Sequence, residues 1–218
     1  MTVTGIEPYP KGKGRVSVYL NDKFAFVLYK GELSQHDLEI GKVVDDELYD
    51  RIMQETVYPR AKKRGMNLLK SMDRTEADVR RRLSEGGYPE DAVDVAIDYL
   101  CSYRYIDDTR YANEYIRSRT GSMSRKQITV KLLQKGVAAD VIEAAFEDVC
   151  SEDGTDSDLR ERELIRKLIL KRFPNGTGGI EYSDRQKLFA YLYGKGFSVP
   201  MIEEVYSSLD ITCPNDYY

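Results

Sequence analysis

The residue types that most often carry enzyme chemistry are few in this sequence and stand apart from one another. His36 is the only histidine, and it lies in a polar segment at residues 34–37. A catalytic triad or a histidine-based metal site would need partner residues nearby, so we expect His36 to be a surface residue. The carboxylates Asp107 and Asp108 stand directly before an apolar-patterned segment. That position favours helix capping over acid–base catalysis.

Cysteines and glycines offer no stronger site. Cys101, Cys150 and Cys213 are widely spaced and form no CxxC pair, which predicts neither a zinc site nor a disulfide framework. The glycine-rich runs at 12–14 and 176–179 lack the strand-then-helix context of a phosphate-binding loop. The sequence therefore predicts a non-enzymatic protein without a cofactor or metal.

Neither a membrane span nor a secretory signal is visible in the sequence. No stretch approaches the roughly 20 apolar residues that a membrane-spanning helix needs. The N-terminal segment also lacks the apolar core of a signal peptide. We therefore expect a cytoplasmic protein without membrane contact.

Basic residues are the remaining candidates for binding chemistry, because charge is segregated along the chain. Residues 57–135 hold 17 Lys and Arg against 11 Asp and Glu, residues 136–158 hold 8 acidic residues and no basic one, and residues 159–195 hold 9 basic against 4 acidic residues. Basic stripes on helices could meet phosphates or an acidic protein surface, whereas plain solvation of helix faces is the alternative. The candidate partner- or DNA-binding residues are Arg80, Arg81, Arg82, Arg117, Arg119, Arg125, Lys126, Lys131, Lys135, Arg166, Lys167, Lys171 and Arg172.

An internal repeat predicts the elements that would carry these basic residues. Three segments begin with a residue able to cap a helix: Thr75, Ser124 and Asp184. Four and eight positions later each has an apolar residue, and twelve positions later each has a glycine suited to end a helix. The apolar pairs are Val79 and Leu83, Ile128 and Leu132, Leu188 and Leu192; the glycines are Gly87, Gly136 and Gly196.

A second amphipathic helix follows each of these segments, and another precedes it. The helix before the first segment matches less well, because Arg64 and Gly65 occupy positions that are apolar elsewhere. Pro59 lacks an amide donor, so we expect the preceding helix to kink or restart near Val57. The acidic segment 151–158 and the Gly-rich segment 174–179 are predicted to be exposed, mobile connections.

The first 30 residues have a different pattern. Val16, Val18 and Leu20 alternate with polar residues, and Asn21-Asp22 separates them from a second apolar run. This pattern predicts a β-hairpin. Residues 3–7 could add a third strand.

The second repeat also carries a run of residues that resembles a known family. The run is Tyr105, Ile106, Asp107, Asp108, Tyr111, Ala112, Tyr115, Ile116 and Arg119. It is similar to the signature of the bacterial RecX regulators, and the segment from Thr75 to Tyr88 resembles the one that precedes it in that family. The resemblance covers residues 57–209 and implies a cytoplasmic modulator, usually an inhibitor, of the RecA recombinase in DNA repair and the SOS response. Such proteins bind the RecA filament on single-stranded DNA and dampen recombination, ATP hydrolysis and co-protease activity.

Taken together, these patterns predict a mainly α protein. Three tandem three-helix repeats form an elongated, curved array after a small N-terminal antiparallel β segment. The expected domains are residues 1–44 (β segment), 45–106 (linker helix and first repeat), 107–156 (second repeat) and 157–218 (third repeat and tail). We expect a monomer that acts on the RecA filament, with weak direct DNA binding left open. The alternative functions are a direct DNA-binding helical repressor and a repeat scaffold for another protein.

Overall fold

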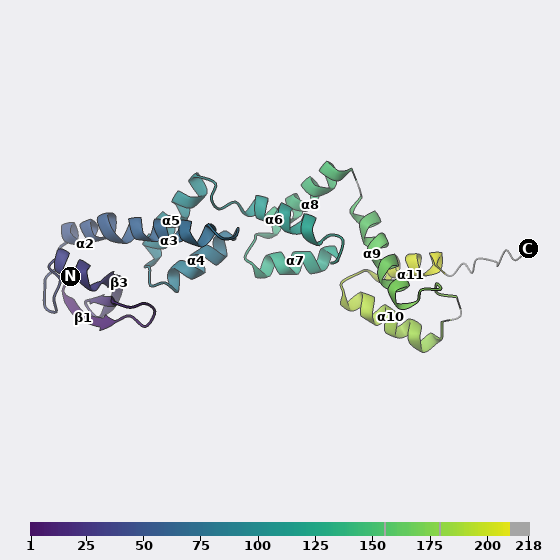
Figure 1. The fold of residues 1–218 in the computed structure, drawn as a ribbon, viewed down its shortest axis with the longest axis horizontal. Helices are drawn as coiled ribbons and strands as arrows, with labels where there is room; N and C mark the ends of the chain where they lie inside the picture. Colours follow the sequence, from purple (N-terminus) through teal and green to yellow (C-terminus); the bar gives the residue numbers. More distant parts are fainter. Residues whose placement is uncertain (155, 179, 210–218) are drawn as a thin grey trace, which may run out of the picture. The chain divides into compact units, whose positions relative to one another are not determined.

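The computed structural model describes residues 1–154, 156–178 and 180–209 of the 218-residue chain (Figure 1). The chain divides into two compact units, Met1–Asp108 and Thr109–Tyr218. In the described part of the chain, no helix combines the length and the apolar composition that crossing a membrane requires.

The first unit begins with an antiparallel sheet in the order β1 (Val3–Pro8), β2 (Arg15–Leu20) and β3 (Lys23–Tyr29). Asn21 and Asp22 both have positive φ, at 47° and 62°, as a two-residue hairpin turn between twisted strands requires. The predicted hairpin and third strand are confirmed.

Helices then lead from the sheet into the first repeat. The short helix α1 (Lys30–Gln35) is followed by α2 (Asp46–Ile52), a π-helical turn (Met53–Val57) and α3 (Tyr58–Leu69). Pro59 lies in the first turn of α3, directly after the π-helical turn, and has no N–H to donate to that turn. The predicted restart near Val57 is therefore confirmed, and the π-turn is the local form that it takes.

Within the described residues, the repeat comprises three triplets of helices. They are α3, α4 (Glu76–Ser84) and α5 (Glu90–Ser102); α6 (Asp108–Arg119), α7 (Arg125–Gln134) and α8 (Ala139–Asp153); and α9 (Ser157–Arg172), α10 (Tyr182–Gly194) and α11 (Val199–Ser208). The apolar positions predicted for the middle helices are at most 1% exposed in all three copies. The glycines that end these helices all have a positive φ between 81° and 92°.

Two of the three predicted caps are confirmed. Thr75 Oγ1 accepts a hydrogen bond from the backbone N–H of Asp78, and Ser124 Oγ accepts one from Gln127, each at 3.2 Å. The prediction that Asp184 caps the third middle helix was wrong, because α10 begins at Tyr182 after the extended residue Glu181. Asp184 therefore lies inside the first turn, where its charge complements the helix dipole and pairs with Lys187 at 3.0 Å.

The hydrophobic core differs between the two units. In the first unit the sheet and the first repeat share one core, in which Val18 and Phe26 pack together with Val57 and Leu100. Gly65 permits this packing, because a Cβ at that position would lie 2.5 Å from Leu100 Cδ1. The second and third repeats each have a separate core. The weak match at Gly65 thus reflects close approach of α3 to α5.

The expectation that His36 lies at the surface was wrong. Its side chain belongs to a residue that is 8% exposed, and Nε2 lies 2.9 Å from Thr56 Oγ1 in the π-helical turn. The turn after α1 that carries His36 lies against the π-helical turn, which covers the imidazole. A polar setting in the sequence did not reveal this tertiary contact.

Both predicted connections are shorter or better anchored than expected. Helix α8 runs to Asp153 and α9 begins at Ser157, so most of segment 151–158 is helical. In segment 174–179, Thr177 is 1% exposed and its Oγ1 donates to the carbonyl of Tyr206 at 3.2 Å. The break between α9 and α10 is confirmed, but part of it is fixed to α11.

The curved arrangement of the repeats and the domain boundaries stay predictions.

We expect Leu132→Ala to reduce the stability of the second repeat by about 2–5 kcal/mol, because the truncation leaves a cavity in its core. Native-state hydrogen exchange of α7 amides measures this loss. Leu133, the next residue, is 47% exposed and supplies the control. Equal exchange rates in Leu132→Ala and Leu133→Ala would contradict the assignment of this stripe to the core.

Candidate functional site

Sites for metal or thiol chemistry are not formed by the residues that the structure describes. No group of three or more His, Cys, Asp and Glu side chains comes together there in a way that could hold a metal ion. Cys101 and Cys150 are free thiols in partly buried positions. Cys213 lies outside the described residues.

The signature residues from Tyr105 to Arg119 have mostly structural positions. Ile106, Ala112 and Ile116 are buried, while Tyr105 is 49% exposed. The rings of Tyr111 and Tyr115 stack at 6.4 Å between centroids. Asp107 is half-buried at the start of the same helix.

Asp108 caps a helix other than its own. Its Oδ1 accepts a hydrogen bond at 2.9 Å from the backbone N–H of Glu76, the first residue of α4. This N–H is one of the free donors at a helix start, which Thr75 alone cannot satisfy. The carboxylate was expected to cap the helix that it precedes; the bond from Glu76 shows Asp108 serving instead the start of the middle helix of the first repeat.

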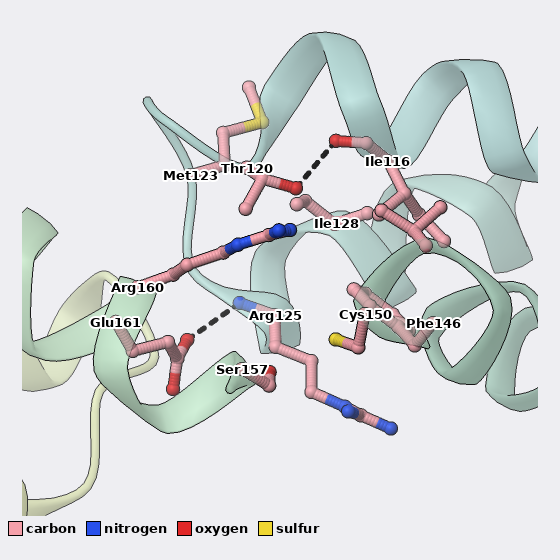
Figure 2. A pocket seen from close by; sticks show the side chains of 11 residues that line it. Ile116, Thr120, Met123, Arg125, Ile128, Phe146, Cys150, Ser157, Arg160 and Glu161 are labelled. Atoms are coloured by element: carbon pink, nitrogen blue, oxygen red, sulfur yellow. Dashed lines mark hydrogen bonds between the residues drawn. The ribbon is translucent and has the colours of Figure 1, made fainter. Parts of the chain in front are cut away.

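Glu161 makes the equivalent bond in the second unit. It occupies the position in α9 that corresponds to Asp108 in α6, and one carboxylate oxygen accepts from the N–H of Arg125 at 2.7 Å. Figure 2 shows this carboxylate directed at the start of α7. The middle helices α4 and α7 thus begin with one cap from the preceding residue and one from the next repeat's first helix, whereas α10 has no side-chain cap among the described residues. Sequence reasoning missed Glu161, although its alignment with Asp108 was visible in the repeat.

Burial raises the pKa of both carboxyl groups. For Asp108 burial is the main cause, opposed by the hydrogen bond from Glu76 and reinforced by the neighbouring carboxylates. For Glu161 burial again raises the pKa, and the bond from Arg125 opposes it. The two groups therefore lie in poorly hydrated positions where the charged form is disfavoured.

A small cavity lies beside the Glu161 bond. Its volume is about 20 Å³, and Figure 2 shows Cys150 and Phe146 on one side of it and Arg160 on the other. A space of this size holds a water molecule at most. It is a packing gap between the second and third repeats, not a ligand site.

The three consecutive arginines of α4 are engaged in ion pairs within the first unit. Arg80 bonds to Glu76 at 2.7 Å and to Asp94 at 2.5 Å. Arg81 and Arg82 both contact Asp78, and Arg81 also reaches Glu85. Burial would raise the pKa of Asp78, but hydrogen bonds from Arg82, Arg74 and Arg81 outweigh it and lower the pKa to about 2. Any anion that binds these arginines must compete with the carboxylates that already hold them.

Several candidate basic residues of the second unit are also partnered. Arg117 contacts Glu114 and Glu152, and Arg125 bonds to Glu143 at 2.5 Å. Three others lie over aromatic rings: Arg119 over Tyr115, Lys135 over Tyr111 and Tyr115, and Arg172 over Phe173.

The remaining five candidates make no ion pair or ring contact with described residues. They are Lys126 and Lys131 on α7, and Arg166, Lys167 and Lys171 on α9. Lys167 lines an open cleft of about 400 Å³ together with Arg117 and Arg160. The structure thus brings Arg117 and Lys167, from the second and third repeats, into one basic cleft.

Comparison with known proteins gives one consistent family. The N-terminal domain model of regulatory protein RecX matches residues 1–45, and the models of its first, second and third three-helix domains match residues 61–100, 107–145 and 160–206. Regulatory protein RecX of Clostridium acetobutylicum is 30% identical over 208 residues, which cover 94% of each chain. The Clostridium perfringens (strain 13) relative is 27% identical over 89% of this chain and 90% of its own.

Two crystal structures have a similar fold. One, of regulatory protein RecX, has a TM-score of 0.61 and 28% identity, and covers 94% of this chain and 98% of its own. The other, of RecX from Lactobacillus salivarius, has a TM-score of 0.59 and 24% identity, and covers 71% of this chain and 97% of its own. The second likeness supports the fold alone.

The architecture and these matches define a regulatory protein built from a small sheet and tandem three-helix domains. This chain belongs to the RecX family, whose members are non-enzymatic. The predicted family, the mainly helical fold and the non-enzymatic class are confirmed.

We expect Glu161→Gln to stabilise the second unit at pH 7, because the amide oxygen keeps the bond to Arg125 without a buried charge. The folded pKa of Glu161 lies above its usual value of 4.5. Its contribution to stability is therefore full below that pH and is lost as the pH rises through the folded pKa. The melting temperature of Glu161→Gln should exceed that of the wild type at pH 7 and approach it at pH 4.

Two further variants define the expected pattern. Glu161→Ala leaves the Arg125 N–H without its acceptor and should reduce stability by about 1–3 kcal/mol. Glu163→Gln, on an exposed residue of the same helix, is the control and should show no such pH dependence. If the two Gln variants respond alike to pH, the helix-start bond is not the cause.

Proposed function

We propose that this protein binds the RecA filament on single-stranded DNA and inhibits recombination, ATP hydrolysis and co-protease activity. The observation that carries the proposal is membership of the RecX family along nearly the whole chain, with all four domain models matched. A protein with this target acts in the cytoplasm, in DNA repair and the SOS response.

The charge distribution supports a surface on the second unit. Lys126, Lys131, Arg166, Lys167 and Lys171 have no carboxylate partner among the described residues. Binding of phosphates or acidic side chains to these five residues requires no exchange of an existing ion pair. Exposed charges of this kind raise association rates and make binding sensitive to salt.

We expect Arg80, Arg81 and Arg82 to contribute less to partner binding than the five unpaired residues. Each already bonds to one or more carboxylates of α4 or α5. Reversal of all three to Glu would place negative charge beside Asp78 and destabilise the first repeat. Charge variants on α9 therefore test filament binding more cleanly than variants on α4.

The function is tested by titrating the purified protein into RecA-driven ATP hydrolysis on single-stranded DNA. We expect the steady-state rate to fall as filaments are capped or shortened. An unchanged rate together with an unchanged filament lifetime would sink the proposal.

For the surface, we expect Lys167→Glu combined with Lys171→Glu to raise the concentration needed for half-inhibition about tenfold at low salt. The control is Lys23→Glu combined with Lys187→Glu, which changes net charge equally at exposed residues outside the candidate set. Equal inhibition by the two double variants would show that α9 does not contact the filament.

Experiments with the purified protein also distinguish the two alternative functions. A direct DNA-binding repressor would give a sequence-specific footprint without any recombinase. A scaffold for another protein would leave RecA activity unaffected and capture a different partner from a lysate. Either result would replace the filament proposal.

A further inference from the structure

A second basic cleft lies within the first unit, where the N-terminal sheet meets the first repeat. Its volume is about 500 Å³, within the usual range for small-ligand pockets. The β1–β2 loop, the end of β3, one face of α3 and the C-terminal end of α4 form its walls. None of the candidate binding residues identified from sequence lines it except Arg82.

Cations dominate the lining of this cleft. Six basic side chains face one carboxylate, that of Glu85: Lys11, Arg15, Arg60, Lys63, Arg64 and Arg82. Arg60, Lys63 and Arg64 follow the spacing i, i+3, i+4 and therefore share one face of α3. Asn67, at i+7, continues this face and lines the same cleft.

Most of this positive charge is not neutralised within the protein. Arg60 bonds to Glu32 at 2.6 Å, and Arg82 bonds to Asp78 at 2.9 Å. Glu85 is itself paired with Arg81 at 3.0 Å. Among the described residues, by contrast, no carboxylate pairs with the other four cations, which are Lys11, Arg15, Lys63 and Arg64. The cleft therefore carries an excess of positive charge.

Two of the arginines are held in place by backbone carbonyls and aromatic rings. Arg15 donates to the carbonyls of Lys11 and Gly86 and lies over the ring of Tyr9 at 4.8 Å. Such bonds fix a guanidinium group without cancelling its charge. Its Nε is buried and has no hydrogen-bond partner among the described residues.

Arg60, on α3, has a similar arrangement. It donates to the carbonyl of Val27 and lies over the ring of Tyr29 at 5.3 Å. Its Nε is also buried and unpartnered within the described part of the chain. Arg60 is already paired with Glu32, so Arg15 is the one of these two fixed guanidinium groups whose charge a bound anion would offset.

The pKa of Tyr88 is affected by three of these guanidinium groups. Burial raises the pKa of its hydroxyl, while Arg60, Arg15 and Arg64 all act to lower it. The guanidinium groups of Arg15 from β2 and of Arg60 and Arg64 from α3 thus all act on one tyrosine that lines the cleft.

We propose that this cleft binds a phosphate group, either a phosphodiester of single-stranded DNA or the phosphate of a free nucleotide. Arginine forks match the tetrahedral oxygens of phosphate, and the ammonium groups of Lys11 and Lys63 add charge at the rim. Tyr29 is 45% exposed beside these cations and offers an aromatic face to a base. The proposal does not depend on RecA and concerns the first unit alone.

The test uses the full chain and the variant Lys63→Gln combined with Arg64→Gln, since both residues are exposed and unpaired in the described structure. The control is Lys23→Gln combined with Lys70→Gln, which removes equal charge outside the cleft. Binding of fluorescent oligo(dT) is measured by anisotropy without RecA. Binding of ADP and of inorganic pyrophosphate is measured by calorimetry.

We expect the cleft variant, but not the control, to lose about tenfold in affinity for one phosphate ligand at 50 mM salt. If the source is DNA, the loss appears with oligo(dT), and the slope of log K against log salt becomes shallower by about 1.4, because each neutralised phosphate of a single strand contributes about 0.7. If the source is a free nucleotide, the loss appears with ADP and pyrophosphate alone.

Two outcomes would overturn the proposal. One is that the cleft variant and the control bind every phosphate ligand alike. The other is that a poly-glutamate peptide binds as tightly as the phosphate ligands and shows the same loss, which would make the cleft a surface for acidic protein. An unchanged RecA ATPase rate, in contrast, would bear on the proposed function and leave the phosphate cleft untouched.

Discussion

The free amide groups at the start of each middle helix are the constraint on which the described repeats depend. In α4 and α7 a hydroxyl from the preceding residue satisfies one N–H, and a carboxylate from the first helix of the next triplet satisfies another. Neither donor could be buried without an acceptor, so the order of helices and the identity of the capping residue are linked. The acidic residue in the signature thus has a structural role: the carboxylate of Asp108 accepts a hydrogen bond from a free N–H at the start of α4.

Charge pairing divides the basic residues into two groups with different roles. Where carboxylates lie within reach, as around Asp78, arginines tie α4 to itself and to α5. Where no described carboxylate pairs with a basic residue, as for Lys167 and Lys171 on α9 and for Arg15, Lys63 and Arg64 in the first-unit cleft, positive charge remains available for an external anion. Charges that the fold leaves unpaired can bind an anion without first breaking an existing ion pair.

The predictions from sequence succeeded where the signal was local and repeated. The apolar stripes, the glycine stops and the caps Thr75 and Ser124 each depend on residues within one helical segment. The prediction of Asp184 as a helix cap failed because α10 begins three residues earlier in the repeat than its counterparts, and the sequence offered no sign of that shift. His36 failed because the π-helical turn that covers it lies 20 residues away along the chain.

The sequence by itself determined the three-helix repeat, the hairpin and the family, because hydrophobic periodicity and helix-end residues act over a few neighbouring positions. Only the tertiary structure decided which basic side chains are neutralised and which remain unpaired. It also brought Arg15 from the sheet against Arg60 and Arg64 from α3, residues more than 40 positions apart that share no local pattern. Coulomb interactions depend on distance in space, so the charges of a binding surface follow from the packing of elements and not from their order.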